Sequence, residues 1–249
     1  MTELLRGVRA FFSGFHFILT TPGIWGFAAI PVLVATLLIG GFMALGVWGA
    51  GAAAAAIFGE PSGDWGEAGL FATRIFFYVL AALIAILAGM ALAQPISGPA
   101  LDRIVRAHEQ ALGGSTWPET SFVESLGRSL RVTLTTLAIG VPILILLTAI
   151  ELVFPPVAIV TMPLKFCVSA LLASWDLIDY PFSLRGADVQ ARFTWLKQNF
   201  AAAFGFGAMI AFVALVPFLG LLMLPVGVAG ATKLIFVGEP ATRARGGPM

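Results

Sequence analysis

An apolar stretch from residue 199 to residue 237 is too long for a single membrane crossing and is interrupted near its middle. Pro217 divides it, and Pro225, Gly227 and Gly230 follow within the second part. Where a membrane helix is broken, backbone N–H and C=O groups lose their partners, and they are tolerated only beside protein or a water-filled cavity. The stretch therefore predicts two short helices folded back within a bilayer, with Pro217 and Pro225 shaping the hairpin. A pathway for a solute is the first functional hypothesis.

Composition places the rest of the chain in the same class. Of the 249 residues, 59% are hydrophobic and 11% are charged, whereas a soluble domain carries about 25% charged residues. The net charge of +1 and the lack of a clustered basic face argue against a nucleic-acid partner. We expect one all-α, polytopic membrane domain over residues 1–249, with full transmembrane helices, partly penetrating helical hairpins and interfacial amphipathic helices.

The first half of the chain contains one amphipathic segment and two long apolar runs. Residues 1–22 place Arg6 and Arg9 among apolar residues that recur at steps of three and four, which predicts an interfacial helix. Residues 24–57 and 70–93 each exceed the roughly 20 residues needed to cross a hydrocarbon core. Both runs are therefore expected to be transmembrane helices.

The second half is expected to alternate surface and membrane segments. Pro142, Glu151 and the Pro155-Pro156 pair interrupt one long apolar run, which predicts a second folded-back hairpin. At its tip, Glu151 and Lys165 are expected to end apolar arms at an interface, and an ion pair or a gate between them is the alternative. The expected segments are a surface helix over 100–112, broken hairpins over 132–175 and 199–237, and a flexible tail over 238–249.

The distribution of charge predicts the orientation in the membrane. The loop over 58–69 carries three acidic residues and no Lys or Arg, whereas the other long polar segments are basic. The positive-inside rule then places the loop outside and both termini in the cytoplasm, with a single orientation.

Four local motifs occur in the order found in a known family. They are TTPGIWGFAAIP (20–31), AQPISGPALDRIV (93–105), WDLIDYPFSLRG (175–186) and FGFGAMIAFVALVPFLGLLMLPVGVAGAT (204–232). In these motifs the chain resembles the CysZ sulfate permeases, which share a superfamily with the eukaryotic etoposide-induced membrane proteins. The resemblance implies a multi-pass protein of the bacterial inner membrane, often a homo-oligomer among membrane lipids. It also implies passage of sulfate into the cell for cysteine biosynthesis.

The same resemblance implies an oxyanion site at the turn before the first transmembrane helix. Backbone N–H groups of Gly23, Ile24 and Trp25 would hold the anion at a helix start, and Gly26 would allow close approach. The family's pattern usually carries an Arg pair where this chain has Trp25 and Gly26. Sulfate specificity is therefore in question, and a changed substrate is one consequence of this replacement.

Two readings of the missing arginines stay open. Arg6, Arg9 or His16 would supply the charge from the interfacial helix, or all three would make ordinary headgroup contacts. The motif at 204–232 and the Pro22-Gly23 turn favour a sulfate or related oxyanion permease with passive or proton-linked flow. The Trp25-Gly26 replacement favours a changed substrate or the alternative, a structural or interaction protein of the membrane whose anion site is lost or altered.

Charged residues near residue 180 have two readings as well. Asp176 and Asp179, paired with Arg185, would fix a helix end, and proton coupling through Asp179 is the alternative. The sequence has no Gly-rich phosphate loop and no His-Glu-x-x-His run. We therefore expect no enzyme, no catalytic residues, no metal site and no cofactor.

Overall fold

The computed structural model describes residues 2–58, 63–114, 121–187, 189–216 and 219–238. Within these ranges the chain is helical and contains no strand, which confirms the all-α class. The elements are α1 (Thr2–Thr20), η1 (Pro22–Ile24), α2 (Trp25–Phe58), α3 (Gly63–Ile96), α4 (Gly98–Ala111), α5 (Phe122–Val153), η2 (Pro155–Val157), α6 (Ala158–Leu184), α7 (Val189–Gln198), α8 (Phe200–Ala214) and α9 (Leu219–Gly238).

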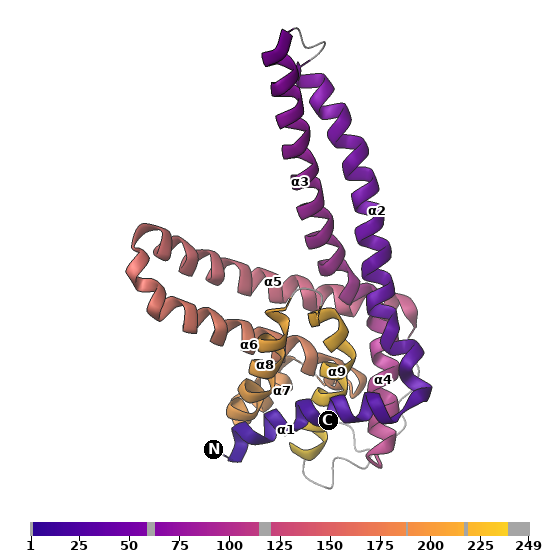
Figure 1. The fold of residues 1–249 in the computed structure, drawn as a ribbon. Helices are drawn as coiled ribbons and strands as arrows, with labels where there is room; N and C mark the ends of the chain where they lie inside the picture. The colour runs from indigo at the N-terminus through magenta and orange to yellow at the C-terminus, as the bar shows by residue number, and fades with distance from the viewer. Residues whose placement is uncertain (1, 59–62, 115–120, 188, 217–218, 239–249) are drawn as a thin grey trace.

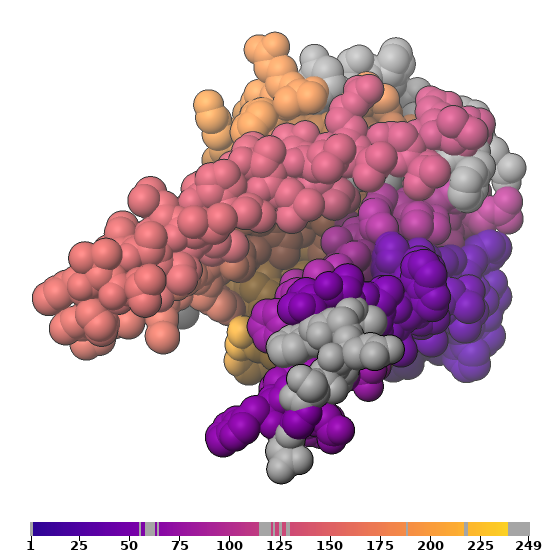
Figure 2. Space-filling view, turned by 90° about the horizontal axis from the view of Figure 1, so that it is seen from above, coloured from indigo at the N-terminus to yellow at the C-terminus, as the bar shows by residue number. Residues whose placement is uncertain are grey.

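Two long hairpins project from a base of shorter helices. The α2–α3 hairpin extends in one direction and the α5–α6 hairpin in another, while α1, α4, α7, α8 and α9 gather where the two meet (Figure 1). Seen from above, the α5–α6 hairpin projects well beyond the rest of the molecule (Figure 2). In the described part of the chain, five helices are long and apolar enough to cross a membrane: α2, α3, α5, α6 and α9. The chain is therefore a polytopic membrane protein.

Tryptophans mark the two ends of the membrane-crossing part of α2. Trp25 begins the helix and Trp48 lies 23 residues later, about 34 Å along the axis at 1.5 Å per residue. Indole rings prefer the two membrane interfaces, and a hydrocarbon core is about 30 Å thick. The spacing of the two tryptophans along the helix thus matches one full crossing, and α2 continues past Trp48 to Phe58.

Prolines interrupt the helices less than the sequence predicted. Pro225 lies inside a continuous α9, and Pro142 inside a continuous α5, so the breaks expected at these residues are wrong. A proline costs a helix one backbone donor, and in membrane helices neighbouring groups and small local adjustments compensate for the loss. The actual reversal between α5 and α6 is at Phe154, just before η2. Pro217 and the tail 239–249 lie outside the described residues.

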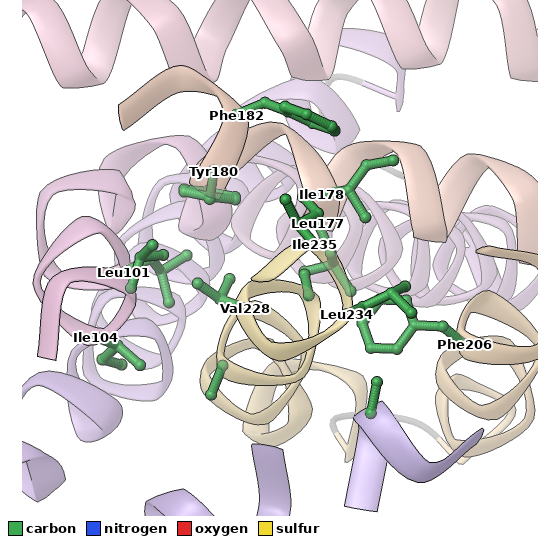
Figure 3. Close-up of a cluster of buried hydrophobic side chains, with 14 of the residues drawn as sticks. Leu101, Ile104, Leu177, Ile178, Tyr180, Phe182, Phe206, Val228, Leu234 and Ile235 are labelled. Atoms are coloured by element: carbon green, nitrogen blue, oxygen red, sulfur yellow. The ribbon is translucent and has the colours of Figure 1, made fainter. Parts of the chain in front are cut away.

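The hydrophobic core of the base surrounds α9. Side chains from α4, α6 and α8 converge on this helix, among them Leu101, Ile178 and Phe206, which are almost fully buried (Figure 3). The expected surface helix is part of this core: α4 buries Leu101, Ile104 and Val105. It therefore packs into the protein along one face, which the sequence reading did not anticipate.

Glycines allow α1 to lie directly on α8 and α9. A Cβ at Gly14 would stand 2.2 Å from the Val226 carbonyl oxygen, and one at Gly7 would stand 1.9 Å from the Ala202 carbonyl oxygen. Backbone contact this close is possible only where no side chain intervenes. Helix α1 is thus fixed to the base, with the start of α2 at its end.

At Asn199 the chain turns sharply between α7 and α8. The two helices are bent by 94° at this break. The 15 residues of α8 extend about 22 Å, less than a roughly 30 Å hydrocarbon core. The geometry therefore makes α8 a short arm beside the long crossings.

Candidate functional site

The predicted anion turn forms the start of α2, and two of its donors are occupied. The Ile24 N–H donates to the Thr21 carbonyl at 3.1 Å, and the Trp25 N–H donates to the Pro22 carbonyl. Both groups close the η1 turn, so the prediction that they face an anion needs correction. Gly23 is the first residue of this helix start with a backbone N–H, because Pro22 has none.

The two glycines of the turn border open space. A Cβ at either Gly23 or Gly26 would meet no atom within 4 Å, so neither glycine is required for packing. Trp25 lies between them with its indole half-exposed, and its Nε1–H donates to the Ile18 carbonyl at 2.8 Å. Trp25 therefore ties the turn to the end of α1 and leaves the space beside the glycines uncovered.

A cation reaches this turn from α4. The guanidinium carbon of Arg103 lies 5.2 Å from the centre of the Phe27 ring, and Phe27 directly follows Gly26. A guanidinium at this distance from an aromatic ring is in cation–π range. Residue 103 is about 80 positions from the turn in sequence, so only the fold brings the two together. The sequence signal that could have indicated Arg103 as a site residue was its position in the motif at 93–105, one of the four motifs that resemble the family.

Two of the three cations proposed from the sequence, Arg6 and Arg9, lie far from the turn along α1. Arg6 forms an ion pair with Glu3 at 3.0 Å and donates to Asn199, near the far end of α1. Arg9 is 13 residues before the turn, about 20 Å along the helix axis. His16 is exposed, and it is the nearest of the three to the turn in sequence.

A buried ion pair joins α4 to the end of α6. Glu109 accepts hydrogen bonds from Nε and Nη2 of Arg185, at 3.1 and 2.7 Å. The side chains are 2% and 4% exposed, respectively. Two charges taken out of water to this extent are stable only as a pair. Glu109, which the sequence reading did not single out, is thus the partner that holds Arg185.

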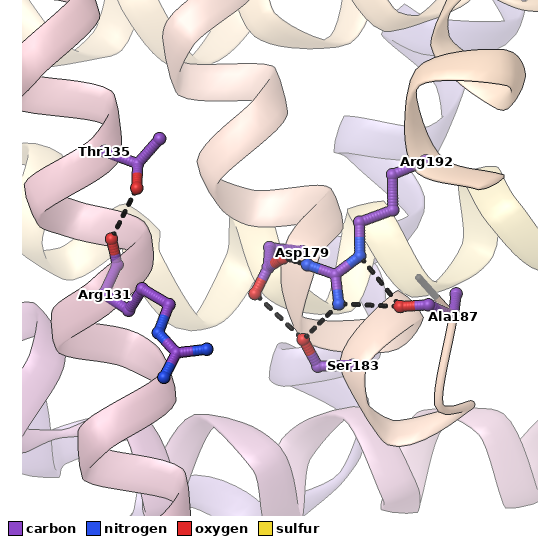
Figure 4. Close-up of polar contacts among 6 residues, drawn as sticks. All are labelled: Arg131, Thr135, Asp179, Ser183, Ala187 and Arg192. Carbon is purple, nitrogen blue, oxygen red and sulfur yellow. Dashed lines mark hydrogen bonds and ion pairs between the residues drawn. The ribbon is translucent and has the colours of Figure 1, made fainter. Parts of the chain in front are cut away.

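Asp179 has a different partner from the one predicted. It forms an ion pair with Arg192 of α7 and accepts a hydrogen bond from Ser183 at 2.9 Å (Figure 4). Arg192 also donates to the Ala187 carbonyl at 2.9 Å. The predicted pairing of Asp179 with Arg185 is therefore replaced by two ion pairs that fix the connection between α6 and α7.

The second aspartate of the predicted cluster also faces another helix. Asp176 accepts a hydrogen bond from Gln94, near the end of α3. The contact links the long α2–α3 hairpin to α6. The three charged residues that were expected to form one cluster thus contact three different helices: Asp176 contacts α3, Asp179 contacts α7 and Arg185 contacts α4.

His108 is a buried histidine, adjacent in sequence to Glu109 of the Glu109–Arg185 ion pair. Its Nδ1 lies 2.8 Å from the Ala229 carbonyl oxygen, and its ring stacks on Phe17 at 4.0 Å between centres. The pKa of His108 is lowered from 6.5 to about 4, mainly by burial; the Ala229 hydrogen bond raises it in part, and the charge of Lys233 adds to the lowering. The imidazole is consequently neutral at physiological pH.

The tip of the α5–α6 hairpin carries a pair of opposite charges. Glu151 accepts hydrogen bonds from Lys165 and from Thr161, and the two charged side chains form an ion pair. The sequence analysis gave a direct ion pair between Glu151 and Lys165 as an alternative, and the structure confirms that pair. The contact joins α5 to α6 close to the reversal at Phe154, which follows Glu151 by three residues.

Among the described residues, no group of three or more His, Cys, Asp or Glu side chains is placed to hold a metal ion. The groups that the short helices at the foot of the two hairpins offer to a ligand are backbone N–H groups and arginine side chains. Arg103 is at the turn, Arg106 is one helical turn further along α4, and Arg185 lies beyond Glu109. Such groups bind and pass a small anion.

Comparison with known proteins gives a consistent set of relatives. The family described as sulfate transporter CysZ/etoposide-induced protein 2.4 matches residues 10–225. The chain is 28% identical over 244 residues to the sulfate transporter CysZ of Pectobacterium atrosepticum, covering 92% of this chain and 83% of that protein. It is 30% identical over 236 residues to the sulfate transporter CysZ of Vibrio cholerae, covering 86% of each. A sulfate transporter CysZ of Pseudomonas paraeruginosa is 32% identical over 120 residues, covering 48% of this chain and 46% of that protein.

Proposed function

Since this chain belongs to the sulfate transporter CysZ/etoposide-induced protein 2.4 family, we propose that it is a membrane permease for sulfate or a related oxyanion. The observation that carries this proposal is the position of the Arg103 guanidinium over Phe27, in the first turn of α2. Gly23 and Gly26, which flank the start of the same helix, border open space. The family's usual arginines are absent from positions 25 and 26, and α4 supplies a cation in their place.

The arrangement suits a tetrahedral dianion. The start of a long helix carries partial positive charge, and the Gly23 N–H is not one of the two groups that close the η1 turn. A guanidinium adds charge-assisted hydrogen bonds, each worth roughly 1.5–3 kcal/mol. The N–H of Gly23 and the guanidinium of Arg103 together form the proposed entry site, with Gly26 leaving room for the anion to approach the backbone.

From this entry the anion would follow α4 into the base. Arg106 and Glu109 succeed Arg103 at intervals of three residues, so the three side chains follow one side of the helix. Arg185 is held by Glu109 when no anion is present, and it is the next cation along this line. We place the barrier to flow at the Glu109–Arg185 pair, because an arriving anion would have to replace Glu109 as the partner of Arg185.

The setting of the protein follows from the same proposal. The chain would lie in the bacterial inner membrane with both termini in the cytoplasm, act without chemistry on its substrate, and supply sulfate for sulfur assimilation. Membrane lipids and further copies of the chain would cover the exposed apolar faces of the two hairpins, which include Leu37 of α2 and Leu152 of α5, both at least three-quarters exposed. Asp179 would support the pathway by holding Arg192 and the α6–α7 connection in place.

Uptake of radiolabelled sulfate into liposomes tests the proposal. Wild-type protein should accumulate sulfate above empty liposomes, and Arg103→Gln should reduce the initial rate at low sulfate about tenfold or more. Arg9→Gln is the matched control, because Arg9 is an exposed cation of the neighbouring helix and should leave uptake unchanged. Equal uptake by both variants would remove Arg103 from the site.

The Trp25-Gly26 pair favours a second candidate, in which the fold no longer transports sulfate and acts as a structural or interaction protein of the membrane. Sulfate flux at the level of empty liposomes, from protein whose thermal unfolding is cooperative, would support this candidate. Uptake of a different oxyanion in the same assay would instead point to a changed substrate.

A further inference from the structure

The carboxylate of Glu109 meets Arg185 through one of its two oxygens. Nε and Nη2 of Arg185 both donate to Oε1, at 3.1 and 2.7 Å. The other oxygen, Oε2, is buried and accepts no hydrogen bond from the described residues. A carboxylate oxygen in this position is the atom at which a carboxyl group can carry a proton. Glu109 therefore has one oxygen engaged by a cation and one oxygen open to protonation.

The side chain of Glu109 lies among apolar groups that shut out water. It is 2% exposed, and Val105, one turn earlier on α4, is fully buried. A Cβ at Gly114 would stand 2.7 Å from Cγ of Glu109 and 3.1 Å from the ring of Phe236, so the end of α4 and helix α9 cover Glu109. An ionised carboxylate in such surroundings depends on its bonded cation.

Charged and titratable side chains on α4 and on the helices packed against it set the electrostatic surroundings of Glu109. They are Asp102, Arg103, Arg106 and His108 on α4, Glu124 and Arg131 at the start of α5, Asp179 and Arg185 towards the end of α6, and Lys233 on α9. Arg185 donates directly to Glu109, Asp179 is paired with Arg192 of α7, and the charge of Lys233 acts on His108. Arg185 is thus the bonded cation on which the ionised form of Glu109 depends.

The proposed passage of sulfate would take this cation away. The N–H groups of Arg185 would donate to sulfate oxygens in place of Oε1 of Glu109. The ionised carboxylate and the dianion would then compete for one buried guanidinium. Negative groups held this close together favour protonation of one of them.

Resting on the proposed transport of sulfate, we propose that Glu109 takes up one proton for each sulfate that binds at Arg185, which makes the chain a proton-coupled oxyanion transporter. The proton comes from water and forms an O–H bond at Oε2. It is released when sulfate leaves and Glu109 again pairs with Arg185, and no bond of the sulfate is broken. The coupling role belongs to Glu109 rather than to Asp179, which Arg192 and Ser183 hold in the α6–α7 connection.

Equilibrium sulfate binding to the purified full chain, measured as a function of pH, tests the proposal. The dissociation constant of the wild type should fall about tenfold for each unit by which the pH is lowered, because the bound state holds one more proton. A pH-indicator dye in weakly buffered solution should report about one proton taken up per sulfate bound. The infrared difference spectrum should gain the C=O band of a protonated carboxyl group when sulfate binds.

Glu109→Gln separates coupling from a merely structural role. Its neutral amide imitates the protonated carboxyl group, so it should bind sulfate at least as tightly as the wild type, without pH dependence and without proton uptake. A variant that was only destabilised would bind sulfate more weakly. Glu109→Asp keeps a carboxyl group and should retain proton uptake, which preserves the comparison if Glu109→Gln does not fold.

Two other titratable residues provide matched controls. Asp176→Asn neutralises a carboxylate of α6 that faces Gln94, and His108→Phe removes the histidine adjacent to Glu109. Both variants should keep the proton uptake and the pH dependence of the wild type, because neither residue contacts Arg185.

The outcomes separate the coupling from the transport on which it rests. Sulfate binding by the wild type with no proton uptake and no pH dependence would overturn the coupling and leave the permease in place. Proton uptake that persists in Glu109→Gln, or that disappears in Asp176→Asn or His108→Phe, would overturn the assignment to Glu109. A wild type that binds no sulfate at any pH would overturn both proposals.

Discussion

Glu109 of α4 and Arg185 at the end of α6 form an ion pair that is almost completely buried in the base of the molecule. The pair connects a helix that carries the proposed entry cation, Arg103, to the connection that is held by Asp179 and Arg192. The same two side chains thus contribute both to the proposed anion path and to the packing of the short helices.

Removing one partner of this pair should destabilise the protein strongly. Glu109→Gln removes the carboxylate to which the buried Arg185 guanidinium donates, which costs about 3–5 kcal/mol. The double variant Glu109→Leu with Arg185→Met should lose less, because no charge remains to be desolvated. Thermal unfolding followed by tryptophan fluorescence in detergent measures both. A double variant less stable than Glu109→Gln would contradict a purely electrostatic origin of the loss.

The glycine contacts of α1 lead to a paired comparison. Gly14→Ala places a methyl group 2.2 Å from the Val226 carbonyl oxygen and forces α1 away from α9, at a cost of about 1–3 kcal/mol. Gly26→Ala enters open space and should leave the melting temperature unchanged or slightly raised, because Ala is the better helix former. If both variants melted at the same temperature, the close approach of α1 to α9 would be wrong.

Much of the fold could be predicted from periodicity and apolar length, because these properties follow from local chemistry and the membrane. The all-α class and the polytopic architecture are confirmed. The breaks predicted at Pro142 and Pro225 are wrong, because a residue's helix-breaking tendency is local and the compensation by neighbouring helices is not. The burial of α4 was missed for the same reason, since its partners α9 and α6 lie far along the chain.

The site was less predictable than the fold. The turn from Pro22 to Gly26 could be found by motif, but the occupation of the Ile24 and Trp25 donors depends on the geometry of η1. Arg103 could not be assigned to the site from the sequence, because only the packing of α4 against the start of α2 places it over Phe27. The partners of Asp179 and Arg185 could not be chosen from sequence, because several opposite charges lie within reach and only packing selects among them.

Buried His108 should make the protein less stable in acid. Its pKa is about 4 in the folded protein and 6.5 in the unfolded chain, so between these values the unfolded chain binds more protons. The free energy of unfolding should then fall by about 3 kcal/mol as the pH drops from 6.5 to 4. His108→Phe keeps an aromatic ring beside Phe17 and should flatten this dependence, whereas His16→Gln, at an exposed position, should not. Parallel pH profiles for wild type and His108→Phe would rule out this histidine as the cause.

The proposed orientation can be checked with single cysteines. In a Cys167→Ser background, Glu67→Cys near the start of α3 should react with a membrane-impermeant maleimide added outside intact cells. Lys197→Cys on α7 should react only after the cells are opened. The opposite pattern would invert the topology, and equal labelling of both positions would show insertion in two orientations.

Equilibrium binding of radiolabelled sulfate to the purified protein tests the central claim most directly. The account predicts that Arg103→Gln raises the dissociation constant about tenfold or more, the loss of one charge-assisted interaction. It predicts that Arg9→Gln leaves the constant unchanged, because Arg9 lies about 20 Å from the turn. Unchanged binding by Arg103→Gln, or weakened binding by Arg9→Gln, would contradict an anion site built from the start of α2 and the arginine of α4.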